Sequence, residues 1–271
     1  MINCSGNLIP SIKAASRAIL ESLLTGFHIK ETIRYQKNNL LFWELHYFRM
    51  MASLRRHRFN IPVEYTLVYL ENELIKTIEN NISNQADFLL SITFIKHEGN
   101  IDFIISTTKV LPFSINPLDY YSVDLYKEEF ISSGFFSNLT YTNNSLRIIS
   151  TSYSIENGLE DCILLNDQKN LAESIKGTLY LFQGNTIFTP NLESGCQDLS
   201  LRAAFNEWIL EKKTIYVLKE QTINPFELQK SDELMVLSIN QGVQNITKYR
   251  KTNYTKGKAA LLFEKFKESL G

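Results

Sequence analysis

The sequence predicts an α/β protein of two domains, an α+β domain over residues 1–110 and an α/β domain over residues 122–271. The chain has 271 residues, of which 44% are apolar, which is enough for one large core or two small ones. Strand-like alternation and helical spacing follow each other along the whole chain, as is typical of mixed folds. Residues 111–121 hold two of the six prolines and show no periodicity, which indicates an interdomain connection.

Two hairpins are predicted in the first domain. Residues 31–42 contain two short alternating runs around Lys37-Asn38-Asn39, and polar turn residues between such runs are typical of a hairpin. Residues 88–94 and 101–106 are rich in β-branched and aromatic side chains and flank Glu98-Gly99-Asn100. We therefore expect an antiparallel sheet in this domain.

Two helices are predicted between these hairpins. Helical spacing predicts the first over residues 43–58, with an apolar stripe of Leu41, Leu45, Phe48 and Ala52. The opposite side of this helix would carry polar residues, among them His46 and Arg49. The second helix is predicted to follow Asn60-Ile61-Pro62, because a cap residue and a first-turn proline are start signals.

The second domain alternates helices and strands. Helices are predicted over residues 143–157, 198–212 and 258–270. Strands are predicted over residues 162–166, 179–182, 186–189, 215–218 and 234–238. Gly184-Asn185 would turn the chain between the second and third of these strands.

The overall charge excludes some classes of partner. Lys plus Arg number 28 and Asp plus Glu 29, so a net charge of −1 offers no field to attract nucleic acid or an anionic membrane. No apolar run approaches the roughly 18 residues of a membrane span. The first residues lack the basic and apolar parts of a signal peptide. We expect a cytoplasmic protein with no membrane partner.

Few residues form a recognisable chemical motif. The cysteines, Cys4, Cys162 and Cys196, are isolated and predict neither a disulfide framework nor a zinc site. The four histidines lack metal-ligand spacing, so no metal is expected. The run Arg55-Arg56-His57-Arg58 could bind phosphates, or it could be the solvated last turn of a helix, where cations suit the dipole.

Several strings, taken in order, resemble one family over nearly the whole chain. They are Glu31-Thr32-Ile33-Arg34, Glu44 to Arg49 with Ser53, Leu164-Leu165-Asn166 with Ala172-Glu173, and Phe188-Thr189-Pro190 with Gly195-Cys196 and Arg202. The set resembles the class IV aminotransferases, fold-type IV pyridoxal phosphate enzymes that include branched-chain and D-amino acid aminotransferases and 4-amino-4-deoxychorismate lyase. The resemblance implies the D-amino acid aminotransferase-like fold, a cofactor site at a cleft between the domains, and a homodimer.

The resemblance also implies roles for four residues. Arg49 stands where the family arginine binds the cofactor phosphate, and Glu173 where the family glutamate keeps the pyridine nitrogen protonated. The helix beginning near Ser200 and Leu201 would direct its backbone amides at the phosphate. From the residues alone, Arg49 could instead form a surface ion pair, and Glu173 could be a turn carboxylate.

One string departs from the family at the residue that carries the chemistry. The family has Ser-Asn-Leu-Lys, with a Schiff-base lysine, whereas this chain has Ser137-Asn138-Leu139-Thr140. The stretch from there to Leu159 keeps the family spacing, so Thr140 stands at the lysine position. A threonine hydroxyl can neither bond to the cofactor aldehyde as an amine does nor carry the Cα proton.

Other family positions have changed as well. The departing positions are Thr25-Gly26-Phe27-His28, Ile175-Lys176-Gly177-Thr178, Leu199 and Leu237. In the family these positions hold Tyr-Gly-Asp-Gly, a small Thr-Ser-x-Asn segment, a glycine before the phosphate amides, and a phosphate-binding threonine. Together the changes predict a pocket released from pyridoxal phosphate, with the cofactor absent or at most non-covalent.

The predicted function is that of a non-transaminating homologue, a pseudoenzyme or small-molecule binding protein with a small anion in its cleft. No residue is a convincing catalytic group. The alternative is an active aminotransferase or aminodeoxychorismate lyase-type enzyme that uses Lys30, which stands at a substrate-side position of the family, as a relocated amine. Lys30 could instead extend to solvent, or pair with Glu31 or a neighbouring carboxylate.

Overall fold

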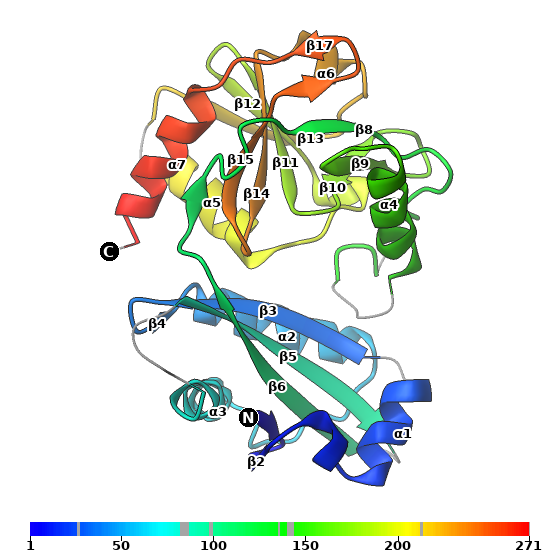
Figure 1. Ribbon diagram of the computed structural model, residues 1–271, viewed down its shortest axis with the longest axis vertical. Helices are drawn as coiled ribbons and strands as arrows, with labels where there is room; N and C mark the ends of the chain where they lie inside the picture. The colour runs from blue at the N-terminus through cyan, green and yellow to red at the C-terminus, as the bar shows by residue number, and fades with distance from the viewer. Residues whose placement is uncertain are drawn as a thin grey trace. The chain divides into compact units, whose positions relative to one another are not determined.

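The computed structural model describes residues 1–25, 28–81, 87–97, 100–134, 136–139, 144–211 and 214–270. Contacts divide the described chain into two compact units (Figure 1). Met1–Pro112 form the first unit, and Phe113–Leu139 with the described residues from Asn144 onward form the second. Most of the segment predicted as a connection therefore belongs to the second unit, where strand β7 (Ser114–Ile115) pairs in parallel with β15 (Gly242–Ile246).

The first unit contains a six-stranded antiparallel sheet in the order β2-β1-β6-β5-β3-β4. Its strands are β1 (Ile2–Cys4), β2 (Asn7–Ile9), β3 (His28–Gln36), β4 (Asn39–Leu40), β5 (Asp87–His97) and β6 (Asn100–Val110). Both predicted hairpins are present as β3–β4 and β5–β6. Lys37 and Asn38 have φ values of 48° and 60°, as a tight hairpin turn requires. The predicted turn residues Glu98 and Gly99 lie outside the described residues.

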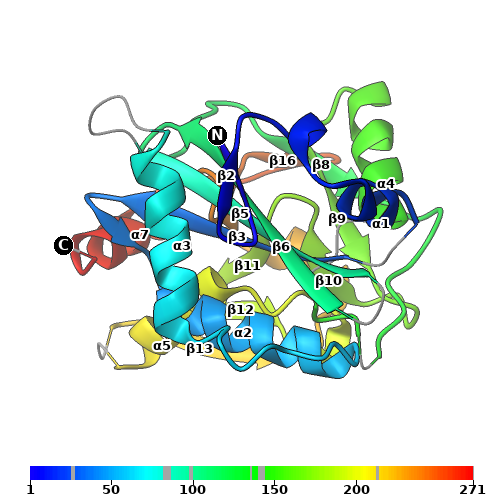
Figure 2. The same cartoon turned by 90° about the horizontal axis from the view of Figure 1, so that it is seen from below.

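Three α-helices accompany this sheet in the described part of the first unit. They are α1 (Arg17–Thr25), α2 (Trp43–Arg56) and α3 (Leu67–Glu79), after a 3₁₀ turn at Ile12–Ala14. Helices α2 and α3 pack on one sheet face around Leu54, Leu74 and Phe94 (Figure 2). Helix α1 contributes Ile19 to a smaller cluster with Ile95.

The predicted apolar stripe of α2 is wrong for Leu45 and Phe48, although Leu41, which precedes the helix, is buried. Phe48 is 62% and Leu45 36% exposed, whereas Met50, Leu54 and the polar His46 are buried. The helix is rotated away from its apolar spacing because Glu31 on the adjacent strand bonds to polar side chains of α2 and draws that side inward. Arg55 and Arg56 form an exposed last turn.

Helix α3 begins later than predicted. Thr66, and not Asn60, caps it, since the Thr66 hydroxyl accepts a hydrogen bond from the Tyr69 amide at 3.2 Å. Pro62 lies in the loop that precedes the helix. A proline in the first turn and a proline in the preceding loop give the same sequence signal, which explains the error.

The second unit contains two sheets. One has five strands in the order β10-β9-β8-β16-β17, namely β8 (Ser122–Leu125), β9 (Asp161–Leu165), β10 (Leu171–Ser174), β16 (Lys248–Tyr249) and β17 (Thr252–Asn253). The other has six strands in the order β13-β12-β11-β14-β15-β7, which adds β11 (Thr178–Gln183), β12 (Thr186–Pro190), β13 (Val217–Gln221) and β14 (Glu233–Ser238). Side chains of both sheets, including Leu165, Leu181 and Val236, share one apolar core.

Four α-helices accompany these sheets in the described part of the unit. They are α4 (Ser145–Glu156), α5 (Ser200–Glu211), α6 (Glu227–Lys230) and α7 (Lys258–Glu268), with a 3₁₀ turn at Leu192–Ser194 (Figure 1). Helices α5 and α7 meet in an aromatic cluster that includes Phe205 and Phe266, 5.1 Å apart between ring centroids. None of the described helices is long and apolar enough to cross a membrane.

Candidate functional site

The residues singled out from the sequence fall into both units. Lys30 and Arg49 belong to the first unit, and Glu173, Ser200 and Leu201 to the second. Thr140, at the family's lysine position, lies outside the described residues.

Arg49 forms an ion pair beneath the sheet of the first unit. Its guanidinium donates to one carboxylate oxygen of Glu31 on β3, and the Arg49 side chain is only 8% exposed. His46, one turn earlier on α2, lies 2.6 Å from the other oxygen through its Nδ1 atom. Burial alone would raise the pKa of Glu31, but the charge of Arg49 and the hydrogen bond with His46 hold it below its ordinary value. The family resemblance implied a phosphate as the partner of Arg49, whereas in this structure its partner is Glu31.

Lys30 lies on the other face of the same sheet. Neighbouring residues of a strand point to opposite faces, so Glu31 faces α2 and Lys30 faces away from it. Lys30 is partly buried, and its cross-strand neighbour is Thr93. Among the described residues, its amine has neither a hydrogen-bond nor an ion-pair partner.

Glu173 is the buried carboxylate of the second unit. It lies on β10 with its side chain 6% exposed, and one oxygen accepts a hydrogen bond from the Arg147 guanidinium of α4. The other oxygen accepts from the backbone amide of Gln197 at 2.9 Å. Arg147 also donates to the Ile175 carbonyl at 2.6 Å. Each oxygen of Glu173 therefore accepts a hydrogen bond, and one of the two donors is a positively charged guanidinium.

The turn after Glu173 packs closely against β14. A Cβ atom on Gly177 would lie 2.1 Å from the carbonyl oxygen of Leu237, so the close approach of the β10–β11 turn to β14 requires glycine there. Leu237 is 1% exposed and pairs across the sheet with Thr178. The Leu237 side chain is thus part of the buried sheet packing.

The amino end of α5 has hydrogen-bond donors that lack partners among the described residues. The first helical hydrogen bond runs from the Ala203 amide to the Leu199 carbonyl, so the amides of Ser200, Leu201 and Arg202 precede it. Ser200 is 3% exposed, and its hydroxyl has no hydrogen-bond partner among the described residues. Backbone amides and the positive end of the helix dipole together favour a bound anion.

The side chain of Arg202, a residue that matches a family string, does not join the donors at the amino end of α5, because its guanidinium has other partners. Its guanidinium donates to the Pro190 carbonyl at 3.0 Å and forms an ion pair with Glu220. Asn206 donates to the other Glu220 oxygen at 3.0 Å and accepts from the Tyr180 hydroxyl at 2.7 Å. These contacts join α5 to the six-stranded sheet, which is a structural role.

The cysteines offer no reactive thiolate. All three are buried as free thiols. Burial raises the pKa of both Cys162 and Cys196 to about 12. Across the described residues, no group of three or more His, Cys, Asp or Glu side chains could hold a metal ion.

A comparison with protein families identifies the chain. A family model described as amino-transferase class IV matches residues 28–249. The chain belongs to the class IV aminotransferase family. This is a pyridoxal-phosphate-dependent family of transferases and lyases, and the match includes Arg49, Glu173, Ser200 and Leu201.

Solved structures confirm the class IV aminotransferase fold, although a search of curated proteins found no match. The branched-chain aminotransferase of the archaeon Thermoproteus uzoniensis, solved with norvaline, has a TM-score of 0.83 and 18% identity, covering 98% of this chain and 93% of that one. A putative 4-amino-4-deoxychorismate lyase from Legionella pneumophila has a TM-score of 0.81 and 17% identity, covering 97% of each chain. The branched-chain aminotransferase of Thermobaculum terrenum in its PLP form has a TM-score of 0.80 and 14% identity, covering 99% and 93%.

Arg147 was not among the residues predicted from the sequence. It lies within a predicted helix and is 26 residues from Glu173, so no local spacing links the two side chains. The available signal was indirect, because a carboxylate expected to be buried needs a charged or hydrogen-bonding partner. From the sequence alone, many of the arginines and lysines could have been the partner of Glu173.

Proposed function

We propose that this class IV aminotransferase homologue does not transaminate, and that the part of its ancestral cofactor site around α5 binds a small anion. The proposal depends mainly on the contact between Arg147 and Glu173. Thr140 at the lysine position of the family string supports it independently.

The pyridine end of the cofactor does not fit the residues around Glu173. A pyridine ring acts as an electron sink when its nitrogen is protonated, and the family glutamate maintains that proton. Here a protonated ring would share the Glu173 carboxylate with the Arg147 guanidinium. Two like charges about 4 Å apart repel each other by about 4 kcal/mol at an effective dielectric constant of about 20. That repulsion would shift the ring toward its neutral, inactive form.

The phosphate end fits better. The amides of Ser200 and Leu201 and the unpartnered Ser200 hydroxyl are donors suited to a phosphate, sulfate or carboxylate. The donors of Ser200 and Leu201 remain available to an anion, whereas Arg147 neutralises the Glu173 carboxylate that the pyridine ring would need. Such a site would favour small anions over the complete cofactor. This pattern is consistent with a binding protein.

A chemical trapping experiment tests the first half of the proposal. The purified full-length chain is incubated with pyridoxal phosphate, reduced with borohydride and digested for peptide mass spectrometry, with an active class IV aminotransferase as the positive control. We expect no phosphopyridoxyl-lysine in this chain and no amino-group transfer with a panel of amino acids. A stoichiometric adduct on any lysine would overturn the proposal.

A binding experiment tests the second half. Inorganic phosphate is titrated into the protein while the amide resonances of Ser200 and Leu201 are followed. We expect these resonances to shift, and Ser200→Ala to weaken binding by about 10- to 100-fold through loss of one hydrogen bond to a charged group. The matched control is Ser145→Ala in the exposed first turn of α4, which should leave the affinity unchanged. Equal effects of the two substitutions would reject an anion site at α5.

Lys30 supports the alternative, an active aminotransferase or lyase-type enzyme. A partly buried amine without a described partner is a reasonable candidate for covalent chemistry, because an amine can bond to the cofactor aldehyde. The trapping experiment distinguishes the two proposals, because the alternative requires the reduced adduct on Lys30 and its loss in Lys30→Gln.

A further inference from the structure

The second unit contains a cavity whose lining includes none of the residues around Glu173. Its volume is about 530 Å³, within the range of about 300 to 1,000 Å³ typical of small-molecule sites. Its walls come from the ends of β8, β9 and β16, from the turn after β9, and from α6 with its preceding loop.

The topology of the five-stranded sheet creates this cavity. Strand β8 runs parallel to β9 on one side and to β16 on the other. Leu125, Leu165 and Tyr249 are the last residues of these strands, and all three line the cavity. The carboxyl ends of parallel strands meet at one sheet edge, which is where such sheets commonly bind ligands.

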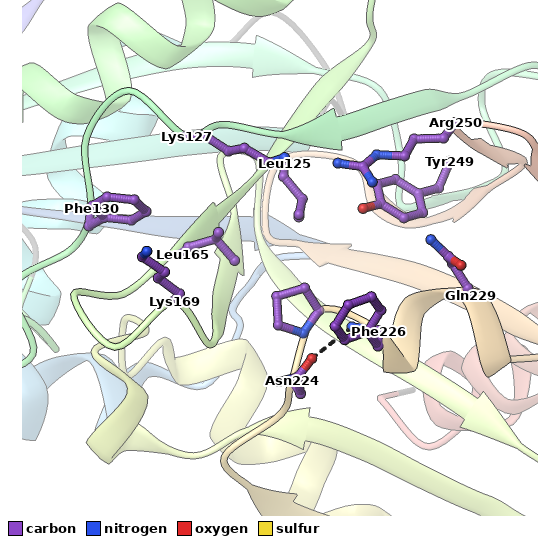
Figure 3. A pocket seen from close by; sticks show the side chains of 11 residues that line it. Leu125, Lys127, Phe130, Leu165, Lys169, Asn224, Phe226, Gln229, Tyr249 and Arg250 are labelled. Carbon is purple, nitrogen blue, oxygen red and sulfur yellow. Dashed lines mark hydrogen bonds between the residues drawn. The ribbon is translucent and has the colours of Figure 1, made fainter.

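The inner wall is largely apolar and aromatic. Leu125 and Leu165 lie between two groups of side chains, with Phe130 on one side and Tyr249 on the other (Figure 3). Phe226 lies across from Leu125 and is 71% exposed. Rings around an apolar floor suit a flat apolar body, which would cover Phe226 when bound.

The rim of the cavity carries three positively charged side chains, of which one is paired with a carboxylate outside the lining. Lys127, Lys169 and Arg250 line the cavity, and the described lining contains no Asp or Glu. Arg250 lies 5.1 Å from the Tyr249 ring and pairs at 3.2 Å with Asp124. Lys127 and Lys169 are exposed, and neither has an ion-pair partner among the described residues.

We propose that this cavity binds a small organic anion with an apolar, preferably aromatic, body. The body lies against Leu125, Leu165 and Phe226, and its carboxylate, sulfonate or phosphate group lies between the amines of Lys127 and Lys169. The apolar walls provide affinity, and the two unpaired amines select for the negative charge. This site is independent of the anion site proposed at α5.

A pair of matched probes tests the proposal. 8-Anilinonaphthalene-1-sulfonate and N-phenyl-1-naphthylamine share their ring system, but only the first carries a negative charge. Each is titrated into the full-length protein, with fluorescence for affinity and the methyl resonances of Leu125 and Leu165 for location. We expect the sulfonate to bind about tenfold more tightly, because an exposed ion pair with each of the two amines contributes up to about fivefold. The Leu125 and Leu165 methyls should shift, while those of Leu201 on α5 should not.

Two sets of variants separate this cavity from general dye binding. Lys127→Gln with Lys169→Gln should weaken binding of the sulfonate about tenfold and leave the uncharged probe within about twofold. The control, Lys219→Gln with Lys251→Gln, removes the same charge from exposed positions outside the lining and should change neither. Gln229→Trp, at an exposed lining position, should obstruct both probes.

Three outcomes would overturn the proposal. The first is equal affinity for the charged and uncharged probes. The second is an equal loss of affinity in the lining pair and the control pair. The third is binding that leaves the Leu125 and Leu165 methyls unshifted, which would place the dye elsewhere.

Discussion

The guanidinium of Arg147 and the carboxylate of Glu173 come from positions 26 residues apart, and their contact is central to the proposed loss of transamination. A lysine restored at position 140 would leave the Arg147 guanidinium bound to the Glu173 carboxylate. Groups that act as a unit in catalysis have strongly non-additive effects, so one replacement is not expected to rebuild the site.

The first prediction combines these two positions. Thr140→Lys alone should give a low yield of borohydride-trapped cofactor, and Thr140→Lys with Arg147→Met should raise that yield several-fold, because the ring no longer competes with a guanidinium. Adding Arg250→Met to Thr140→Lys removes an equal charge elsewhere and should not raise it. In all three variants we expect turnover below about 1 s⁻¹, the lower end of ordinary enzyme rates.

Turnover in the ordinary enzyme range for Thr140→Lys would show that one residue suffices and would contradict the proposal. An equal trapping yield with and without Arg147→Met would show that Arg147 does not hinder the cofactor.

The second prediction concerns the pH dependence of stability at Glu31. Its pKa is lower in the folded protein than in the unfolded chain, so its stabilising contribution is complete above the unfolded value and is lost as the pH falls through the folded value. Glu31→Gln should therefore flatten the acid side of the stability profile. At neutral pH the substitution should cost about 3–5 kcal/mol, because it leaves Arg49 buried without its counter-charge.

Urea unfolding at a series of pH values measures this effect, with Glu44→Gln as the control at an exposed position of α2, the helix that carries Arg49. An unchanged pH profile for Glu31→Gln would mean that the pair with Arg49 does not persist in solution.

At the scale of single elements, the amino end of helix α7 is capped by a carboxylate from strand β14. Gly257, at its amino end, provides no side-chain cap. Instead Glu233 on β14 accepts hydrogen bonds from the amides of Lys258 at 2.9 Å and Ala259 at 3.1 Å. A negative charge at this end of a helix also interacts favourably with the dipole. The cap is invisible to local pattern analysis because 25 residues separate its two halves.

The third prediction follows from this cap. Glu233→Gln should lower the free energy of unfolding by about 1–2 kcal/mol, since it weakens a charge-assisted pair of hydrogen bonds and the interaction with the dipole. Chemical denaturation measures the change, and Glu264→Gln on the exposed side of α7 is the matched control. Equal stability of the two variants would contradict a capping role for Glu233.

At the scale of the whole molecule, each unit has an apolar core of its own, and family membership extends over residues 28–249 of the chain. The fourth prediction is that the protein is a homodimer, as the resemblance to the class IV aminotransferases implies. Light scattering should give a mass of about twice 31.3 kDa over a wide concentration range. A monodisperse monomer at high concentration would contradict it.

Local patterns in the sequence were sufficient for much of the fold. The β3–β4 and β5–β6 hairpins, and α5 and α7 within about two residues of their ends, follow from alternation, turn residues and helical spacing. The very short strands, such as β7, were not predicted, because two residues contain no measurable period and are ordered only by the neighbouring strand.

The sequence by itself determined the family, the absence of a lysine at position 140 and the candidate residues Arg49, Glu173 and Ser200. Only the tertiary structure decided which groups these residues meet: Arg49 with Glu31, Glu173 with Arg147, and Ser200 with no described partner. It also decided that Leu125, Leu165 and Tyr249 line one cavity. The physical reason is range, since periodicity and turn chemistry act over a few residues, whereas ion pairs and pockets depend on side chains brought together by strand pairing from distant positions.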